Sequence, residues 1–170
     1  MASPGRTSKF ILSAVLCGVA LALSLVDGAI SALLPLPGFK LGLANIVSLF
    51  ALYYLGAPYA VLICIVRSLL AGIFSGNLTM LFFSLVGGLL SILIMYLFLK
   101  RLSLIKVSVL GGITHNLAQL MVAALLTATP QVSYYLPVLV LMGTVCGFCM
   151  GVLCRLVFSR LQRETVYEIQ

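Results

Sequence analysis

Long apolar runs, separated by short breaks rich in proline, glycine or charge, constrain the fold of this chain more than any other feature. The breaks fall at residues 35–38, 56–58, 75–77, 100–101 and 129–131. A helix needs about 20 apolar residues to cross a bilayer core of about 30 Å. The runs left between the breaks are 10–34, 40–55, 58–75, 78–99, 104–128 and 134–158. We predict an all-α integral membrane protein, a bundle of about six transmembrane helices in a single domain over residues 1–170. The second run is short enough to begin inside the membrane.

The composition supports burial in a lipid bilayer. Hydrophobic residues make up 63% of the 170 residues and charged residues only 8%, whereas soluble domains average about 45–50% apolar and about 25% charged. The surplus apolar surface must face lipid. Arg6 and Lys9 precede the first run, which is too long for a cleavable signal, so we interpret it as the first helix.

The basic residues give an orientation. Lys/Arg residues mark the cytoplasmic side of membrane proteins. With six spans both termini lie on one side, and that side carries Arg6, Lys9, Lys100, Arg101, Lys106, Arg155, Arg160 and Arg163. The opposite side carries Lys40 alone. We therefore expect both termini in the cytoplasm. The basic residues form no continuous stripe, so no nucleic-acid partner is expected.

A band of polar side chains lies inside the apolar runs, where ionisable groups are costly and usually functional. The ionisable members are Asp27, Arg67 and His115, and the uncharged ones are Asn45, Asn116 and Gln119, with Asn77 at a loop and Lys40 at the outer edge. Counted from the outer breaks, Asp27 and Asn45 lie about 12 Å deep and Arg67 about 15 Å. His115 and Gln119 lie about 16–22 Å deep. This shared depth, from the outer half to the midplane, predicts a pocket open to the outside that binds a small molecule.

Structural alternatives remain open for the same residues. Asp27 and Arg67 could form a buried ion pair that fixes the first helix against the third. His115 and Asn45 could each make an ordinary contact between helices. Paired glycines at 87–88 and 111–112 predict close packing of the fourth and fifth helices.

A ladder of small residues marks the first helix at Ala14, Gly18 and Ala22. Such ladders allow helices to approach closely. Gly18 and Asp27 are nine residues apart, about 180° around a helix, so the ladder and the aspartate face opposite ways. If Asp27 faces inward, the ladder faces lipid or a partner subunit. Packing within the bundle is the alternative.

Motifs for catalysis, metals or cofactors are missing from the sequence. It holds no phosphate-binding loop of the ATPase type and no Cys/His cluster with metal-ligand spacing. Its carboxylates are Asp27, Glu164 and Glu168, and the last two lie in the tail. The five cysteines fall within apolar runs and fit buried small side chains. We expect neither an enzyme nor a bound metal or cofactor, so uphill transport would draw its energy from another chain or an ion gradient.

Four segments together resemble the bacterial Gx transporter family, also labelled heptaprenyl diphosphate synthase component I. They are Lys40 to Val47, Arg67 to Gly72, Ser84 to Gly88, and His115 to Gln119. That family in turn resembles the substrate-binding S components of energy-coupling factor (ECF) transporters. The resemblance implies six helices, an outer substrate pocket, and docking of the first helix on a transmembrane coupling protein that carries two ATPase subunits. It also implies the plasma membrane of a bacterium. The synthase label conflicts with the sequence, because prenyl diphosphate elongation needs aspartate clusters that hold Mg²⁺.

Three functions follow as hypotheses. The first is the substrate-binding S component of an ECF-type importer for a vitamin or a flavin- or quinone-related precursor. The pocket would use Asp27, Lys40, Asn45, Arg67, Asn77, His115, Asn116 and Gln119, and docking would use Ala14, Gly18 and Ala22. The second is a non-catalytic membrane subunit of a redox or quinone-handling complex. The third is a stand-alone secondary transporter coupled through Asp27 and His115.

Overall fold

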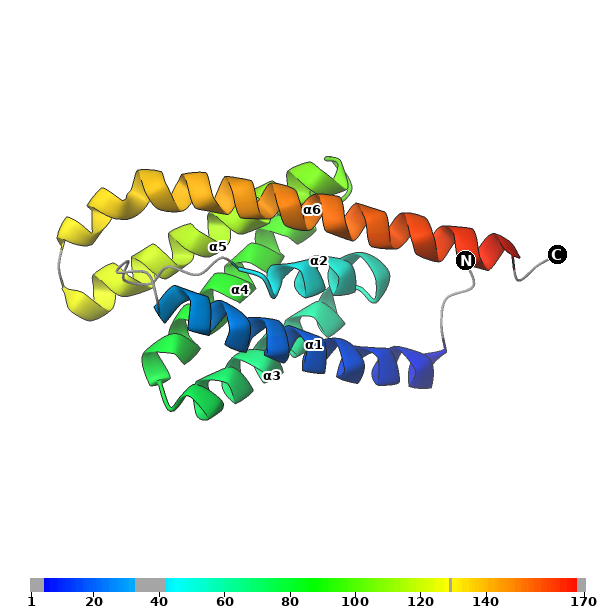
Figure 1. Cartoon of the computed structure of the whole chain (residues 1–170), viewed down its shortest axis with the longest axis horizontal. Coiled ribbons are helices and arrows are strands. Elements are labelled where there is room, and N and C mark those ends of the chain that lie inside the picture. Colours follow the sequence, from blue (N-terminus) through cyan, green and yellow to red (C-terminus); the bar gives the residue numbers. More distant parts are fainter. Residues whose placement is uncertain (1–4, 33–41, 129, 168–170) are drawn as a thin grey trace.

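The chain is built almost wholly from helices. The computed structural model describes residues 5–32, 42–128 and 130–167. Across these ranges the elements are α1 (Arg6–Ala32), α2 (Asn45–Tyr54), α3 (Ala57–Ser75), α4 (Leu78–Phe98), α5 (Leu104–Thr127), the 3-10 helix η1 (Pro130–Tyr135) and α6 (Leu136–Tyr167) (Figure 1). No strand occurs among the described residues. The prediction of an all-α bundle is confirmed.

Five segments are long and apolar enough to cross a membrane, so the chain is a multi-pass membrane protein. They are Arg6–Ser31, Ala57–Ser75, Leu78–Phe98, Leu104–Thr127 and Ser133–Leu161. The remaining apolar helix, α2, has 10 residues and spans about 15 Å, half of a bilayer core. It starts at Asn45, inside the predicted run 40–55. At the ends of the chain, α1 begins at Arg6 and α6 continues to Tyr167, beyond the predicted spans 10–34 and 134–158.

The turns between helices follow from local backbone chemistry. Gly56 precedes α3 with φ +99°, and Pro58 stands in the first turn of that helix. Gly76 ends α3 in the left-handed conformation, with φ +62°, which suits glycine. The Asn77 side chain then caps α4 by accepting a hydrogen bond from the Met80 amide at 3.2 Å. These turns lie at the predicted breaks 56–58 and 75–77.

The short helix α2 lies at the centre of the bundle. The five other α-helices all pack against it, whereas the backbone of α1 comes close to α2 and α3 alone among the described helices. Its side chains Val47, Leu49, Ala51 and Leu52 are buried, and Ile63 and Met95 join them in the main apolar core. A helix that is apolar on every side is stable only when it is enclosed in this way.

Two glycine contacts bring α4 and α5 together. A Cβ added to Gly111 would lie 2.7 Å from the Met95 sulfur, and one added to Gly87 would lie 2.9 Å from His115 Nδ1. The second glycine of each pair faces another neighbour: Gly88 faces α3 and Gly112 faces α6. The predicted close packing of the fourth and fifth helices is therefore made by the first glycine of each pair.

The tightest interface joins α5 and α6, which lie side by side in Figure 1. It uses a ladder of three glycines spaced four residues apart on α6, at Gly143, Gly147 and Gly151. A Cβ on Gly147 would lie 2.8 Å from the Ser108 carbonyl oxygen and from the Val109 Cα. The backbones of the two helices are thus in direct contact, as small residues four apart allow in lipid.

α1 begins and α6 ends on the same side of the bundle (Figure 1). We call this side the terminal end and the opposite side the far end. The described basic side chains outside the buried Arg67 all lie at the terminal end: Arg6, Lys9, Lys100, Arg101, Lys106, Arg155 and Arg160. This is the charge asymmetry that the sequence shows.

Candidate functional site

The two faces of α1 have opposite environments. Asp27 is only 3% exposed and Ser24, three residues before it on the same face, is also buried. On the other face Gly18 is exposed, and an added Cβ there would meet nothing within 4 Å. Ala14 and Ala22 are exposed as well. The aspartate therefore points into the bundle, while the small-residue ladder lies on its surface.

Polar side chains from α1 to α5 converge on one buried cavity. Its lining comprises Ser24, Asp27, Gly42, Ala44, Asn45, Arg67, Ser84 and His115. The space open to the centre of a water molecule is about 10 Å³, room for about one water. We call this space the polar cavity. The sequence predicted that Asp27, Asn45, Arg67 and His115 share a depth, and the structure brings these four together here.

Asp27 holds the chain that leads into α2. Its Oδ2 accepts a hydrogen bond from the Gly42 amide at 2.9 Å, and the Gly42 carbonyl in turn accepts from the Asn45 amide at 2.8 Å. Gly42 has φ +74°, which favours glycine, and its position for a Cβ lies 3.5 Å from the His115 ring. The turn at residues 42–45 is therefore fixed between α1 and α5 by a charge-assisted hydrogen bond.

Arg67 places a cation inside the bundle. One terminal nitrogen, Nη1, donates to Ser24 Oγ at 3.0 Å, and Nη2 lies 3.8 Å from Cys64 Sγ. Its Nε has no hydrogen-bond partner among the described residues. A buried guanidinium normally has all its donors satisfied, so Arg67 retains one donor for a further group. The ion pair between Asp27 and Arg67 stays a prediction; both residues line the same cavity.

His115 and Gln119 form a hydrogen-bonded pair on α5. Gln119 Nε2 lies 3.0 Å from His115 Nε2, and with the amide in this orientation the histidine nitrogen accepts. Gln119 is fully buried, and its Oε1 has no partner within the described part of the chain. Gly87 of α4 allows this pair to approach, because a side chain there would overlap the imidazole.

Ser91 on α4 connects this helix with α2 and α5, next to Asn45 of the polar cavity. Ser91 Oγ lies 3.1 Å from Asn45 Oδ1 on α2 and 2.9 Å from the Gly111 carbonyl on α5. The hydroxyl is fully buried. Asn45 is thus held at the start of α2 with its side chain directed between α4 and α5.

A second hollow lies beside the polar cavity. It has a volume of about 180 Å³ and is lined by Ser24, Leu25, Gly28, Ala29, Ala71, Ser75, Met80 and Ser84. It shares Ser24 and Ser84 with the polar cavity and reaches the exposed residues Leu25 and Ala29 on α1. The Met80 side chain crosses towards α1, with its Cε 3.3 Å from the Cβ position of Gly28. This side hollow is a separate space next to the polar cavity, and it reaches the surface of the bundle beside α1.

Comparison with known protein families gives one match, to the family described as heptaprenyl diphosphate synthase component I, over residues 16–157. The matched region runs from α1 into α6 and includes every residue of the polar cavity. The chain belongs to the heptaprenyl diphosphate synthase component I family. Comparison with curated proteins and with solved structures finds no match. The family resemblance seen in the sequence is confirmed, and the further likeness of this component I family to ECF S components stays a prediction.

The remaining predicted site residues of this component I protein lie elsewhere. Asn116 turns to α6, where its Nδ2 donates to the Leu139 carbonyl at 3.0 Å. Asn77 is exposed and caps α4. Lys40 lies outside the described residues. Gln119 does not line the polar cavity either and contacts it through His115. Ligand binding by these four residues stays a prediction, as does docking through the ladder on α1.

Sequence reasoning missed the small members of the site. Ser24, Ser84 and Ser91 each contribute a hydroxyl, but serine is common in membrane helices, where it can bond to its own backbone. A weak signal existed for Ser24, because it lies three residues from Asp27 and so on the same helix face. Ser84 begins one of the segments that carry the family resemblance, but no role was predicted for its side chain, and nothing in the sequence singled out Ser91.

Proposed function

We propose that this chain is the substrate-binding S component of an ECF-type importer for a small molecule. The supporting observation is the polar cavity, in which Asp27, Arg67 and His115 meet inside an otherwise apolar bundle. Ionisable groups within a membrane are retained mainly for substrates, ions or protons. The chain would lie in the bacterial plasma membrane with its terminal end in the cytoplasm, as its basic residues favour.

The proposed ligand is a small polar or anionic molecule with an apolar part, such as a vitamin or a flavin- or quinone-related precursor. Arg67 Nε would donate to an acceptor or anionic group of the ligand. Gln119 does not line the polar cavity but bonds to His115, which does; once the cavity enlarges, Gln119 Oε1 would accept from a ligand N–H or O–H. The apolar part would occupy the side hollow, which is lined by Leu25, Ala71 and Met80 among others.

Binding requires the cavity to enlarge. Pockets for small molecules usually measure about 300–1,000 Å³, whereas the polar cavity has room for about one water and the side hollow measures about 180 Å³. The simplest opening moves α1 away from α4, because the backbones of these two helices are not in close contact and the Met80 side chain lies between them. Rotation of the Met80 side chain would then merge the two spaces.

Energy would come from other chains. The exposed ladder Ala14, Gly18 and Ala22 would dock on a transmembrane coupling protein that carries two ATPase subunits. A flat strip of small side chains suits close contact with another helix. Gly18 stands at its centre with open space around it.

The first test separates binding from docking. Replacing Gly18 by leucine should leave ligand binding unchanged, because the residue lies on the face of α1 away from Asp27, but it should abolish ATP-dependent uptake. The matched control is Cys149→Leu, which adds the same side chain at an exposed position of α6 and should leave uptake intact. Normal uptake by the Gly18→Leu variant would exclude docking through this face. Uptake into liposomes without ATP would instead establish a secondary transporter.

The second test concerns the ligand itself. Native mass spectrometry of gently purified protein should show a bound small molecule. Gln119→Leu removes the unused acceptor while keeping a similar volume, and it should weaken binding about 10-fold, the usual effect of one buried hydrogen bond. Leu120→Met, a volume-conserving change in the smaller core cluster, serves as a control that should change affinity little. Equal affinity of the Gln119→Leu variant would exclude Gln119, which bonds to the cavity residue His115, as a contact of the ligand.

A second candidate function is favoured by the family description, which names a component of heptaprenyl diphosphate synthase. In that role the chain would be a non-catalytic membrane subunit of a complex that handles prenyl or quinone-like molecules. A catalytic role is not proposed, because the sequence has only three carboxylates and Mg²⁺–diphosphate chemistry relies on grouped carboxylates. Co-purification with a soluble synthase or redox subunit, and with no ATPase, would establish this alternative.

A further inference from the structure

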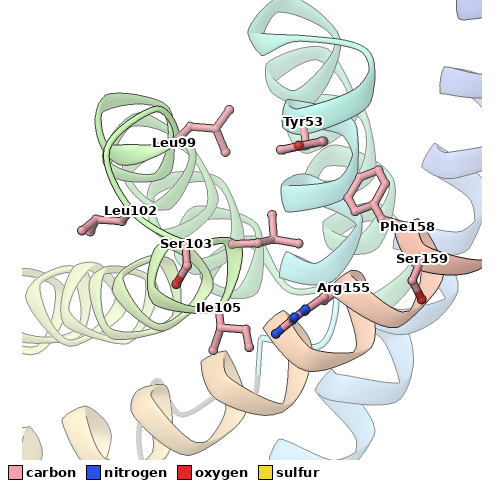
Figure 2. Close-up of a pocket in the computed structure, with 9 residues that line it drawn as sticks. Tyr53, Leu99, Leu102, Ser103, Ile105, Arg155, Phe158 and Ser159 are labelled. Carbon is pink, nitrogen blue, oxygen red and sulfur yellow. The ribbon is translucent and has the colours of Figure 1, made fainter. Parts of the chain in front are cut away.

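A large cavity opens at the terminal end of the bundle, where α2 ends. It measures about 670 Å³ and is lined by Tyr53, Leu99, Leu102, Ser103, Leu104, Ile105, Arg155, Phe158 and Ser159 (Figure 2). We call it the terminal cavity. It lies between the end of α2, the turn from α4 to α5, and α6, so it shares no residue with the polar cavity. Nothing in the proposed transport cycle uses it.

One wall of the terminal cavity is polar and cationic. The Arg155 side chain extends from α6 towards the start of α5, where Ser103 and Ile105 lie (Figure 2). Ser103 is the N-cap of α5, but its hydroxyl makes no capping hydrogen bond. The first amides of a helix have no partner within that helix, so the start of α5 offers hydroxyl and amide donors to the same cavity that Arg155 lines. This wall suits an anion.

The opposite wall is aromatic and apolar. The Phe158 ring stacks on Phe50 at a centroid distance of 4.9 Å and contacts Tyr53 at 4.7 Å. Leu99 and Leu102 line the cavity from the turn between α4 and α5, across from Phe158 (Figure 2). Tyrosine at the end of a membrane helix usually lies at the level of the lipid headgroups. The cavity therefore combines a cationic wall with a wall that can contact acyl chains.

The charge around the cavity is one-sided. Seven basic side chains lie at the terminal end, and Lys100, Arg101 and Lys106 flank the turn that lines the cavity. The only carboxylate whose side chain the structure describes is Asp27, in the polar cavity. We propose that the terminal cavity binds the phosphate headgroup of an anionic phospholipid from the adjacent leaflet. The phosphate lies against Arg155 and the start of α5, and the first part of the acyl chains lies against Tyr53 and Phe158.

The test uses the full chain in nanodiscs of phosphatidylcholine doped with phosphatidylglycerol. The readout is the number of phosphatidylglycerol molecules that stay bound when the protein is released for native mass spectrometry. Arg155→Gln should lower retention about fivefold, since one basic group near an anionic leaflet contributes about that factor. Arg155→Lys should keep most of the retention. Arg160→Gln, an equal loss of charge at an exposed position that does not line the cavity, should change retention less than about twofold.

Three results would overturn the proposal. Equal losses in the Arg155→Gln and Arg160→Gln variants would mean that the lipid responds to general surface charge and not to this cavity. Equal retention of phosphatidylcholine and phosphatidylglycerol would remove the role of charge. Displacement of the lipid by millimolar inorganic phosphate would assign the cavity to a soluble phosphate compound. Retention of ligand by the polar cavity is measured in the same spectra, so failure of this proposal is distinguishable from failure of the transport function.

Discussion

Replacing Gly147 by alanine should destabilise the bundle, although alanine is the better helix former. The 2.8 Å between an added Cβ and the Ser108 oxygen or Val109 Cα falls about 0.6 Å short of the 3.4 Å at which ordinary contact begins. Both obstacles are backbone or Cα atoms that cannot rotate away, so α5 and α6 must move apart. Overpacking of this kind costs about 1–3 kcal/mol, which outweighs the gain of about 0.5–1 kcal/mol from replacing glycine in a helix.

Gly18→Ala is the matched control for this change. It makes the same chemical substitution in a membrane helix, but at a position where an added Cβ meets nothing within 4 Å. Its stability should equal that of the unchanged protein or exceed it by up to about 1 kcal/mol. The two variants should therefore differ by about 1–3 kcal/mol in free energy of unfolding.

The measurement is reversible unfolding in mixed micelles of dodecyl maltoside and SDS, followed by circular dichroism. A shift of the Gly147→Ala midpoint to lower SDS fraction, with the Gly18→Ala midpoint unchanged or higher, agrees with the geometry. If both variants unfold at the same SDS fraction, the contact between the α5 and α6 backbones is not as close as described, and the reasoning fails.

Three further predictions concern the polar groups and the orientation. Ser91→Ala should lower the free energy of unfolding by about 1–2 kcal/mol, because Asn45 Oδ1 and the Gly111 carbonyl lose their shared donor; an unchanged SDS midpoint would contradict this. Asp27→Asn should be milder than Asp27→Ala, since asparagine keeps an oxygen for the Gly42 amide, and thermal melting that ranks them the other way would refute it. A green fluorescent protein fused to the C-terminus should fluoresce, as a cytoplasmic end requires, whereas activity of a periplasmic alkaline phosphatase in its place would reverse the orientation.

Much of the fold could be predicted from the sequence because the membrane imposes simple length rules. Gly56 stands just before α3 and Gly76 just after it, at two of the predicted breaks between apolar runs. The spacing of four residues puts Gly111, His115 and Gln119 on one face of α5, and all three are buried there. Such spacing arguments hold because a helix in lipid is regular over its whole length.

The partners of each polar residue could not be predicted in this way. Asn116 follows His115 directly, yet one bonds to α6 and the other lines the polar cavity. Consecutive residues of a helix point about 100° apart. Which helix each side chain meets therefore depends on where the surrounding helices lie. Gly143, Gly147 and Gly151 are spaced four residues apart in the sequence, but no helix contact was predicted from this spacing. It joins α6 to α5 through direct backbone contact.

The half-length of α2 has a consequence for how the protein enters the membrane. A helix of ten residues is too short to be inserted alone as a span, and the backbone at the start of such a helix needs partners away from water. Only Leu55 and Gly56 separate α2 from α3, so the two helices can enter together as a hairpin. The Asp27 carboxylate accepts a hydrogen bond from the Gly42 amide, so the turn before α2 reaches its final contacts only when α1 is in place. Because α1 precedes α2 and α3 in the chain, it is available as the surface against which this hairpin packs.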